Sequence, residues 1–508
     1  MSGVPTRALH DRLMAGLAAF PRRDAARFLS AAPPLDVDSF ERRILGAERR
    51  LVRAGVACGR QAAEPDSGQL VLLSCRNIDA YLVAIATLWK RGFVPLLADA
   101  DLSREEIGRL VRVFRPGFCL LDRRVDPEGG DAEPLGDSLA GLHAWIPPRR
   151  GAKSENGQGA AKKGDRPGAA IVRLTSGTTG RPRGIVVTAD QLLADAGHIV
   201  RTVGIRPQDT IVTAIPLGHA YGFTHVLMML LLQGTRAVLL EQPLPALLIE
   251  ALSAPGPLVL PATPYLFSLL LQSAGRKKFK GLRICVSAGA LLPEELSRAF
   301  KERFGVPIRT FYGASECGGI SYDRSREGIV PDGCAGAPLD GVEVTVRPEP
   351  GHDDGTGRVS VRSAAVAECY YPDEGADLAP GRFLTSDLAR IDAEGRIRLL
   401  GRVDRMINVG GRKVNPADVE AVLRAVPGVR QAVVFGVPDR NRGQAVCACV
   451  VAARGLGREA ILAACGPRLA SFKVPRHIEF VARIPTNARG KTEYGALVSA
   501  ARPTLHRS

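Results

Sequence analysis

The spacing of apolar residues predicts alternating helices and strands along the first 400 residues. Residues 79–90, DAYLVAIATLWK, have apolar side chains at helical spacing, and an Arg-Gly pair ends the pattern. Residues 94–97 then predict a strand, 105–114 a second helix and 118–121 a second strand. Short β-rich runs follow at 258–260, 283–286 and 309–311. This alternation is typical of layered α/β folds with largely parallel sheets.

The pattern changes after residue 404. A helix at 416–425, strands at 431–435 and 445–451, a helix at 458–469 and a strand at 477–481 predict a small α+β unit. At 508 residues the chain is also too long for one compact core. We therefore expect an α/β protein with a large N-terminal domain of layered α/β subdomains with mostly parallel sheets (1–403). A small, mobile α+β C-terminal domain follows (404–508).

Composition favours a globular, cytoplasmic protein. Apolar content of 45% and charged content of 24% are ordinary for such proteins. The longest apolar stretch, 226–232, is too short to span a bilayer, and the apolar patch at 13–20 lacks the layout of a signal peptide. The 10 cysteines are scattered without metal-ligand spacing, so we expect reduced, mostly buried thiols.

The net charge of +16 indicates that the partners include polyanions. A nucleic-acid-binding protein is therefore one hypothesis. However, the basic residues are spread along the chain without a zinc-finger, RNP-like or basic-zipper pattern. The one local cluster, at 149–163, lies in a polar segment that predicts a disordered linker. ATP, coenzyme A and acidic carrier proteins are polyanions too, so we expect no specific nucleic-acid partner.

A glycine-rich segment, TSGTTGRPRG at 175–184, lies between two strand-like runs at 169–174 and 185–188. Glycine lets backbone N–H groups approach a ligand closely, and successive N–H groups form an anion-binding concavity. The segment therefore predicts a polyphosphate-binding loop, with a flexible surface turn as the alternative. It is not a Walker A motif, which needs Gly-Lys-Ser/Thr leading into a helix. The candidate ATP-binding residues are Thr175, Ser176, Gly177, Thr178, Thr179, Gly180, Arg183 and Gly184.

This segment resembles the phosphate-binding signature of the adenylate-forming superfamily, which includes acyl-CoA synthetases, nonribosomal adenylation domains and beetle luciferases. Arg183 stands where the family usually has lysine, so a planar fork replaces a point charge. Four further constellations occur in the family's order, and together the resemblance spans nearly the whole chain.

The first constellation is PLGHAYGF at 216–223. In the family, the position of His219 borders the carboxylate-binding site, although a core or turn histidine is the alternative. Amino-acid-activating members place an aspartate near this region to pair with the substrate ammonium group. No acid lies between His219 and His225, which favours a simple small-molecule carboxylic acid as the substrate.

The second constellation is SAGALL at 287–292 followed by FYGASEC at 311–317, and it resembles the family's adenine site. The alternative is an ordinary strand-to-loop turn. By the resemblance, Tyr312 stacks on adenine, Ser315 reaches the α-phosphate and Glu316 holds Mg²⁺. A hard oxygen ligand suits magnesium bound to phosphates. Further ATP-binding candidates here are Ala288, Gly289, Ala290 and Gly313.

The third constellation is LTSDLAR at 384–390 with GRVDRMI at 401–407. A carboxylate such as Asp387 can accept both hydroxyls of a ribose, and Arg402 can hold ribose or phosphate oxygens; a strand-end aspartate and a surface arginine are the alternatives. The resemblance implies that Asp387 binds ribose, from Thr-Ser-Asp rather than the usual Thr-Gly-Asp. Asp404 falls at the hinge between the domains. Gly410 and Gly411 match the loop that lines the pantetheine tunnel.

The fourth constellation, IPTNARGKTEY at 484–494, contains Lys491 at the position of the family's catalytic lysine, with a surface lysine as the alternative. The candidate catalytic residues are therefore Lys491, His219 and Glu316, with Glu316 also the metal ligand. The resemblance implies that ATP and Mg²⁺ convert the acid to an acyl adenylate, which a thiol then attacks. Coenzyme A is the favoured acceptor, and the phosphopantetheine of an acidic acyl carrier protein is the alternative. The apolar segment at 261–267 fits fatty and aryl acids equally.

Overall fold

A computed structural model of the chain divides into two compact units, which are described separately. Unit 1 comprises Met1–Val344 and Val361–Phe383, and unit 2 comprises Thr345–Ser360 and Leu384–Ser508. The domain boundary at 403/404 stays a prediction. The structure describes residues 6–18, 26–28, 37–53, 69–76, 79–100, 102, 104–122, 133–134, 142–147, 168–175, 182–349, 355–372, 375–405, 407–409, 412–414, 416–439, 443–465, 468–469, 473–486, 492–493 and 496–497. The predicted linker at 149–163 lies outside them.

One sheet of unit 1 follows the order β1-β10-β9-β11-β12-β13-β14-β15. Its members are β1 (Ala26–Phe28), β9 (Thr210–Thr213), β10 (Arg236–Leu239), β11 (Leu258–Ala262), β12 (Leu282–Ser287), β13 (Ile308–Ala314), β14 (Gly318–Tyr322) and β15 (Cys334–Pro338). Pairing is parallel from β1 to β13 and antiparallel from β13 to β15. The strands predicted near 258, 283 and 309 are therefore confirmed, and they are neighbours.

The second sheet of unit 1 follows the order β18-β8-β7-β3-β2-β4-β6-β5. Its members are β2 (Leu70–Ser74), β3 (Val94–Ala98), β4 (Phe118–Leu121), β5 (Glu133–Pro134), β6 (His143–Trp145), β7 (Ala169–Thr175), β8 (Arg183–Thr188) and β18 (Cys369–Tyr371). The centre, from β7 to β4, is parallel, and the strands on either side are antiparallel.

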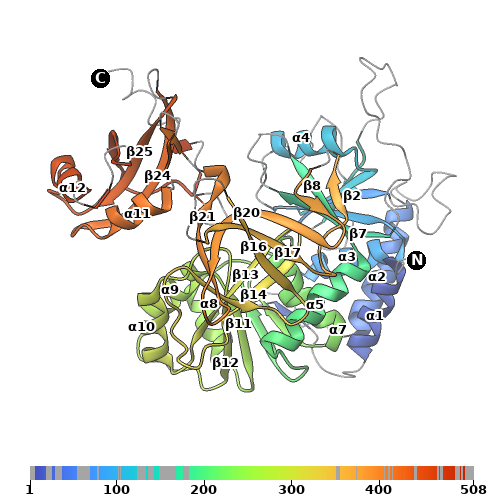
Figure 1. Cartoon of the computed structure of the whole chain (residues 1–508). Coiled ribbons are helices and arrows are strands. Elements are labelled where there is room, and N and C mark those ends of the chain that lie inside the picture. Colours follow the sequence, from blue (N-terminus) through green and yellow to red (C-terminus); the bar gives the residue numbers. More distant parts are fainter. Residues whose placement is uncertain are drawn as a thin grey trace, which may run out of the picture. The chain divides into compact units, whose positions relative to one another are not determined.

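Helices cover the sheets of unit 1 (Figure 1). They are α1 (Thr6–Ala18), α2 (Val37–Arg53), α3 (Asp79–Lys90), α4 (Arg104–Phe114), α5 (Ala189–Val203), α6 (Ala220–Gly222), the π-helix η2 (Phe223–Leu227), α7 (Met228–Gln233), α8 (Pro245–Leu252), α9 (Pro264–Ser273) and α10 (Glu294–Phe304). Helices α8, α9 and α10 pack on β11 and β12, and α4 packs on β2 and β3.

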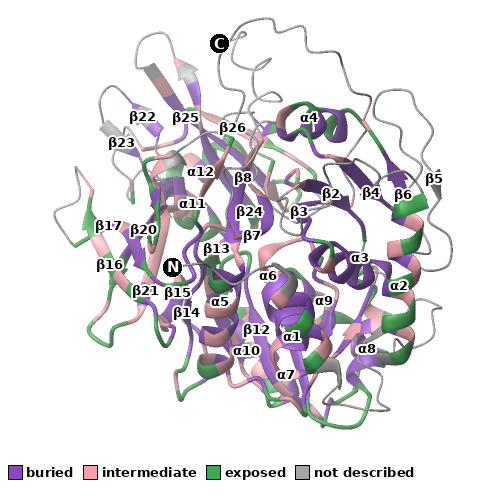
Figure 2. Cartoon of the chain, turned by 90° about the vertical axis from the view of Figure 1, so that its right-hand side faces the viewer, coloured by how far each residue is buried: buried purple, intermediate pink, exposed green. Residues whose placement is uncertain are grey.

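Helix α3 is buried on all sides, unlike α2, which has an exposed stripe (Figure 2). The side chain of Trp89 explains part of this burial. Its Nε1 donates to the carbonyl of Ala170 in β7 at 3.0 Å, and its ring packs edge-on against Phe223 of η2 at 6.2 Å. A helix that is apolar all round is stable only where protein surrounds it. The sequence predicted α3 and α4 closely.

Unit 2 contains all or most of the strands β16 (Glu343–Pro348), β17 (Gly357–Arg362), β20 (Arg382–Ile391) and β21 (Ile397–Arg402), in the order β21-β20-β17-β16. The short β19 (Leu378–Ala379), in unit 1, pairs with the start of β20. The 3₁₀ turn η3 (Val403–Arg405) follows β21.

A separate small sheet in unit 2 has the order β23-β22-β25-β24, with β26 beside β25. Its elements are β22 (Ile407–Val409), β23 (Arg412–Val414), α11 (Pro416–Arg424), β24 (Val429–Asp439), β25 (Gly443–Ala452), α12 (Arg458–Cys465) and β26 (His477–Phe480). Both helices contribute to its core. The predicted α+β unit is confirmed, although α12 ends at Cys465, before the predicted residue 469.

Two expectations from the sequence concern a membrane-spanning segment and the state of the cysteines. Within the described ranges, no helix is long and apolar enough to cross a membrane. The nine cysteines found there are free thiols, all buried except Cys369, which is half-buried.

Candidate active site

The glycine-rich segment connects two strands that pair antiparallel, β7 and β8, with Thr175 opposite Arg183. Its far end is tightly packed. A Cβ at Gly184 would lie 2.6 Å from Val172 Cγ1 and 3.0 Å from Phe114 Cε1, so a side chain does not fit there. The predicted ligands Ser176, Gly177, Thr178, Thr179 and Gly180 lie outside the described residues.

Arg183 and Glu316 both contact one side chain that the sequence analysis missed, Tyr370 of β18. The Arg183 Cζ lies 4.6 Å from the centre of the Tyr370 ring, and the Tyr370 hydroxyl donates to Glu316 Oε1 at 3.2 Å. Burial, with the nearby Glu316 charge, raises the pKa of Tyr370 well above its usual value, so the hydroxyl remains a donor. The structure thus brings a predicted phosphate-binding cation close to the predicted metal ligand.

The predicted adenine and metal residues lie at the hairpin between β13 and β14. Tyr312 and Gly313 lie near the end of β13, where the register shifts, and Ser315 and Glu316 lie in the turn that follows. Close approach of the two strands requires glycine, because a Cβ at Gly313 would lie 2.6 Å from the carbonyl oxygen of Gly318. The structure thus places Tyr312, Gly313, Ser315 and Glu316 within one hairpin.

A buried hydrogen-bonded network supports this turn. Arg173 of β7 is 4% exposed, and its Nη1 donates to the carbonyl of Ser315 at 3.3 Å. Its Nη2 donates to Thr224 Oγ1 at 3.4 Å, and the Thr224 hydroxyl donates to Asp195 Oδ2 at 3.1 Å. Asp195 Oδ1 also accepts the backbone N–H of Gly319 at 2.9 Å. Strands β7 and β14 and helix α5 are thereby joined around the turn.

Burial shapes the charges of this network. It lowers the pKa of Arg173, and the charge of Asp195 partly offsets that effect. It raises the pKa of Asp195, and Arg173 is the largest opposing influence. Each charge therefore lowers the free-energy cost of burying the other. No sequence motif marked either residue, since one lies in an apolar strand and the other within a helix.

The predicted adenine turn Ala288–Gly289–Ala290 directly follows β12. The backbone N–H of Ala288 donates to the carbonyl of Ala262 at 3.2 Å. Gly289 has φ of +88°, a conformation that favours glycine, and is exposed together with Ala290. An exposed glycine turn at the end of a parallel strand is a suitable place for a ligand to approach the backbone.

His219 occupies the N-cap position of α6 without a capping hydrogen bond from its side chain, and its Nε2 is instead hydrogen-bonded to Oδ1 of Asp99, directly after β3. The two side chains are 22% and 21% exposed. The sequence contains no acid between His219 and His225, but the fold supplies one from a distant strand. Asp99 is therefore a second residue that the sequence analysis missed. It orients the imidazole through one ring nitrogen.

His225 of η2 lies in an apolar cage. Its ring is edge-on to Phe311 at 4.5 Å and to Tyr221 at 4.6 Å. Burial lowers the pKa of His225 to about 3, so the ring is neutral at physiological pH. A π-helix of this kind often occurs at a functional site. The Tyr221 hydroxyl donates to the carbonyl of Val286 at 2.8 Å and ties this cage to β12.

The candidates in unit 2 are only partly described. Asp387 and Arg402 face each other across β20 and β21, and Arg402 Nη1 donates to Asp387 Oδ1 at 3.2 Å. Asp404 lies in η3, with its side chain outside the described residues. Three further candidates, Gly410, Gly411 and Lys491, lie wholly outside them.

The carboxylate oxygens of Glu316 suit a magnesium ion that is bound mainly by phosphates. In the described part of the chain, no group of three or more His, Cys, Asp or Glu side chains could hold a metal ion. Mg²⁺ usually takes one or two carboxylates, substrate phosphates and water rather than an all-protein cage. The half-buried carboxylate of Glu316 matches that requirement.

Comparison with known proteins gives matches in both units. The model of the AMP-binding enzyme family matches residues 57–371, and that of the AMP-binding enzyme C-terminal domain matches residues 418–491. The long-chain-fatty-acid–CoA ligase FadD13 of Mycobacterium tuberculosis is 29% identical over 333 residues, which are 63% of this chain and 65% of that protein. The chain thus spans just under two thirds of this relative's length. The 2-succinylbenzoate–CoA ligase of Enterococcus faecalis is 26% identical over 448 residues, which are 86% and 89% of the two chains.

A solved structure shares the architecture. The crystal structure of ATP-bound MatB from Rhodopseudomonas palustris has a TM-score of 0.78 at 23% identity and covers 97% of this chain and 99% of that one. At this identity the similarity shows the fold alone, and it confirms the predicted α/β class with a separate small domain. The family model covers more than half of the sequence, and the resemblance drawn from five motifs is confirmed: the chain belongs to the AMP-binding enzyme family.

Proposed function

We propose that the chain uses ATP to convert a carboxylic acid to an acyl adenylate and then transfers the acyl group to the thiol of coenzyme A. The observation that best supports this proposal is the contact of Arg183 and Glu316 with one side chain, that of Tyr370. A cation suited to phosphate oxygens and a carboxylate suited to Mg²⁺ are thus close together, at the end of the glycine-rich hairpin.

In the first step, a carboxylate oxygen of the acid attacks the α-phosphorus of ATP, and the bond to the β-phosphate breaks to release pyrophosphate. Two anions must meet, so the protein must supply donors and positive charge. We assign this task to the 175–184 segment and to Lys491. Mg²⁺ held by Glu316 would neutralise phosphate charge.

The remaining roles follow from the resemblance. Tyr312 and the turn formed by Ala288, Gly289 and Ala290 would hold adenine, with Gly313 allowing close approach. Ser315 would reach the α-phosphate. Asp387 would bind ribose with Arg402 beside it, and His219 would border the acid's carboxylate. The hydrogen bond from Arg402 to Asp387 supports their joint role.

In the second step, a thiol loses its proton and attacks the acyl carbonyl, and AMP leaves. The names of both relatives are those of CoA ligases, which supports coenzyme A as the acceptor. Gly410 and Gly411 would line the pantetheine path. Loading of an acidic acyl carrier protein is the alternative. The relatives' substrates include a fatty and an aryl acid, and the apolar 261–267 segment fits both kinds.

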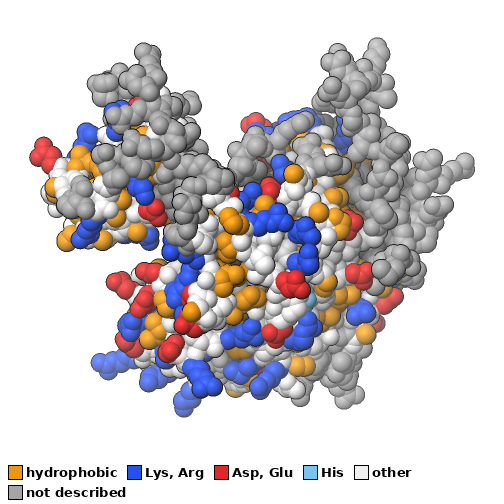
Figure 3. Space-filling view, viewed as in Figure 1, with side chains coloured by type: hydrophobic (Ala, Val, Ile, Leu, Met, Phe, Trp, Pro, Cys, Tyr) orange, Lys and Arg blue, Asp and Glu red, His pale blue; other side chains and the backbone are white. Residues whose placement is uncertain are grey.

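The surface gives little support to the nucleic-acid hypothesis. On the face of unit 1 in Figure 3, basic side chains are interspersed with acidic ones. We expect weak binding to mixed-sequence DNA that falls steeply with salt, as for non-specific contacts. Sequence-dependent binding at physiological salt, with no acid activated, would favour that hypothesis instead.

One experiment tests the main proposal. Pyrophosphate exchange is measured over a panel of fatty and aryl acids, and the best acid is then assayed for AMP release with coenzyme A or a phosphopantetheinylated carrier protein. Exchange with at least one acid, followed by thioester formation on coenzyme A, is the expected result. Exchange without any thioester on coenzyme A would support the carrier-protein alternative.

Lys491→Ala tests the assignment of the catalytic lysine. We expect it to abolish adenylate formation but to spare thioester formation from a pre-made acyl adenylate. Lys473→Ala is the matched control, since Lys473 has no proposed role in the reaction and pairs with Asp418 at 3.6 Å. Equal loss of both half-reactions in the Lys491 variant would contradict the assignment.

We also propose that residues 404–508 rotate about Asp404 between the two steps. Proline fixes φ near −65°, so Asp404→Pro restricts the backbone there, while Asp404→Ala leaves it free. Adenylate formation should persist in both variants, and thioester formation should fall by orders of magnitude in the proline variant only. Thioester formation at the parent rate would argue against this hinge.

A further inference from the structure

The position of Tyr370 is set by strand pairing and by a neighbouring glycine. β18 pairs antiparallel with β8, with Tyr370 opposite Ile185, so Tyr370 lies beside the strand that begins at Arg183. A Cβ at Gly375 would lie 2.7 Å and 2.8 Å from ring atoms of Tyr370 and 3.4 Å from Arg183 Nη1. The chain at Gly375 therefore closes the space beside the ring and limits its movement.

The two contacts of Tyr370 use different parts of the side chain. Arg183 lies over the ring face, where a planar guanidinium is attracted by the π-system and stacks better than an ammonium group. Glu316 accepts a hydrogen bond from the hydroxyl, and such bonds to a carboxylate are among the stronger ones. One rigid ring thus fixes the separation between a cation at the start of β8 and an anion in the turn between β13 and β14.

We propose that Tyr370 is a positioning residue for Mg²⁺-bound ATP. The Tyr370 hydroxyl holds Glu316, and the Tyr370 ring holds Arg183. This inference rests on the proposed ATP-dependent function. It also gives a physical reason for arginine at position 183, where the family usually has lysine. The ring provides a stacking partner that holds a flexible cation in one place before the ligand arrives.

Two variants of Tyr370 test its two contacts separately. Tyr370→Phe removes the hydroxyl but keeps the ring under Arg183. Tyr370→Leu removes both contacts. Tyr371→Phe is the matched control, because its ring packs on Phe114 in the sheet core, 6.0 Å between centroids. Melting temperatures of all variants show whether the fold is intact.

Direct binding is the main measurement, by titration calorimetry with ATP in the presence of Mg²⁺ and, separately, with EDTA. For Tyr370→Phe, loss of one hydrogen bond to a charged group should raise the Kd for Mg²⁺-ATP about tenfold. The Kd measured in EDTA should stay within about twofold, since Arg183 is still supported. Tyr370→Leu should weaken ATP binding both with Mg²⁺ and in EDTA. The KM for the acid, measured by pyrophosphate exchange, should stay unchanged.

A double-mutant cycle tests the stacking contact. Arg183→Lys should weaken ATP binding in the parent but cause little further loss in Tyr370→Leu, because the contact it removes is already absent. Parent-like Kd values for Tyr370→Phe and Tyr370→Leu, in a parent that binds ATP, would overturn this inference and leave the proposed function standing. A parent that neither binds ATP nor exchanges pyrophosphate would overturn both.

Discussion

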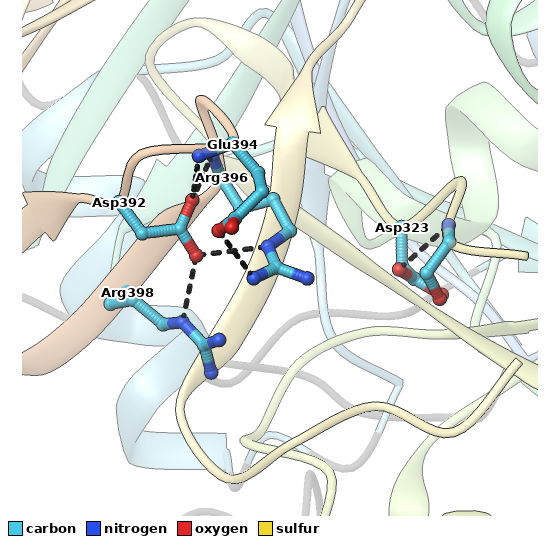
Figure 4. Close-up of polar contacts among 6 residues, drawn as sticks. Asp323, Asp392, Glu394, Arg396 and Arg398 are labelled. Carbon is cyan, nitrogen blue, oxygen red and sulfur yellow. Dashed lines mark hydrogen bonds and ion pairs between the residues drawn. The ribbon is translucent and has the colours of Figure 1, made fainter. Parts of the chain in front are cut away.

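Two hairpin turns of this protein are held by charged side chains in opposite ways. The turn between β13 and β14 is supported by Arg173, a buried residue from another strand, which bonds to the carbonyl of Ser315 at 3.3 Å. The turn between β20 and β21 supports itself through Asp392 (Figure 4). That carboxylate accepts the backbone N–H of Arg396 at 2.8 Å and its Nε at 2.9 Å, and Arg398 Nε at 3.2 Å.

The difference follows from burial and sequence distance. The interactions of the second turn join residues within 392–398, which are mostly half-buried or exposed, so solvent and salt weaken them. The first network joins strands and a helix that are far apart in sequence and excludes water. Only the first turn carries residues to which we assign a role in ATP binding. A turn that must present such residues in fixed positions is thus held by distant buried groups, whereas a turn that only reverses the chain is encoded locally.

The largest expected effect is that of Arg173→Met. Methionine approximates the length of the arginine stem but leaves Asp195 as an uncompensated buried charge, which should cost about 3–5 kcal/mol of unfolding free energy. Denaturant unfolding followed by circular dichroism measures it. Arg398→Met, which removes a partly buried ion pair of the second turn, should cost no more than about 1 kcal/mol. Similar losses in the two variants would contradict the distinction between the turns.

The sequence predicted the elements better than the contacts. The helices at 79–90 and 105–114 and the strands around them have strong periodic patterns, and the two strands that flank the glycine-rich segment follow from its apolar runs. Local propensity and periodicity determine such features, so one sequence is enough. The antiparallel strands at the sheet edges were not predicted, because a short strand has the same pattern in either direction.

The residues that support the candidate site carry no local signal. Tyr370 lies in a three-residue strand that is distant in the sequence from Arg183 and Glu316, and Asp99 directly follows a buried strand without any motif around it. The pair of Arg173 and Asp195 exists only once β7 and α5 are packed together. A single sequence contains these residues but not their pairing, which depends on the tertiary fold.

The second prediction concerns how the stability of the buried network changes at acidic pH. His225, next to Thr224 in the buried network, has a pKa lowered by burial to about 3, below its unfolded value of 6.5. The unfolded chain therefore binds more protons between these values, so stability falls as the pH drops from about 6.5 towards 3, by about 2 kcal/mol at pH 5. His225→Phe keeps the aromatic cage and should remove that loss. Unfolding free energies of parent and variant at pH 7.5 and pH 5 measure it; the same acid loss in both would contradict the prediction.

The smallest effect is expected at the exposed turn, for Asp392→Asn. Partial burial disfavours the charged form of Asp392, but the hydrogen bonds from Arg396 and Arg398 outweigh it and lower the pKa below the usual 3.8. The charge therefore stabilises the fold above about pH 4, and this stabilisation is lost as the pH falls through the lowered pKa. Asparagine still accepts the backbone N–H of Arg396, so we expect a loss of at most about 1 kcal/mol at pH 7, which added salt reduces further. Unfolding at pH 7 in low and high salt measures both effects. A loss that matched that of Arg173→Met and did not respond to salt would mean that this turn is held as the buried one is.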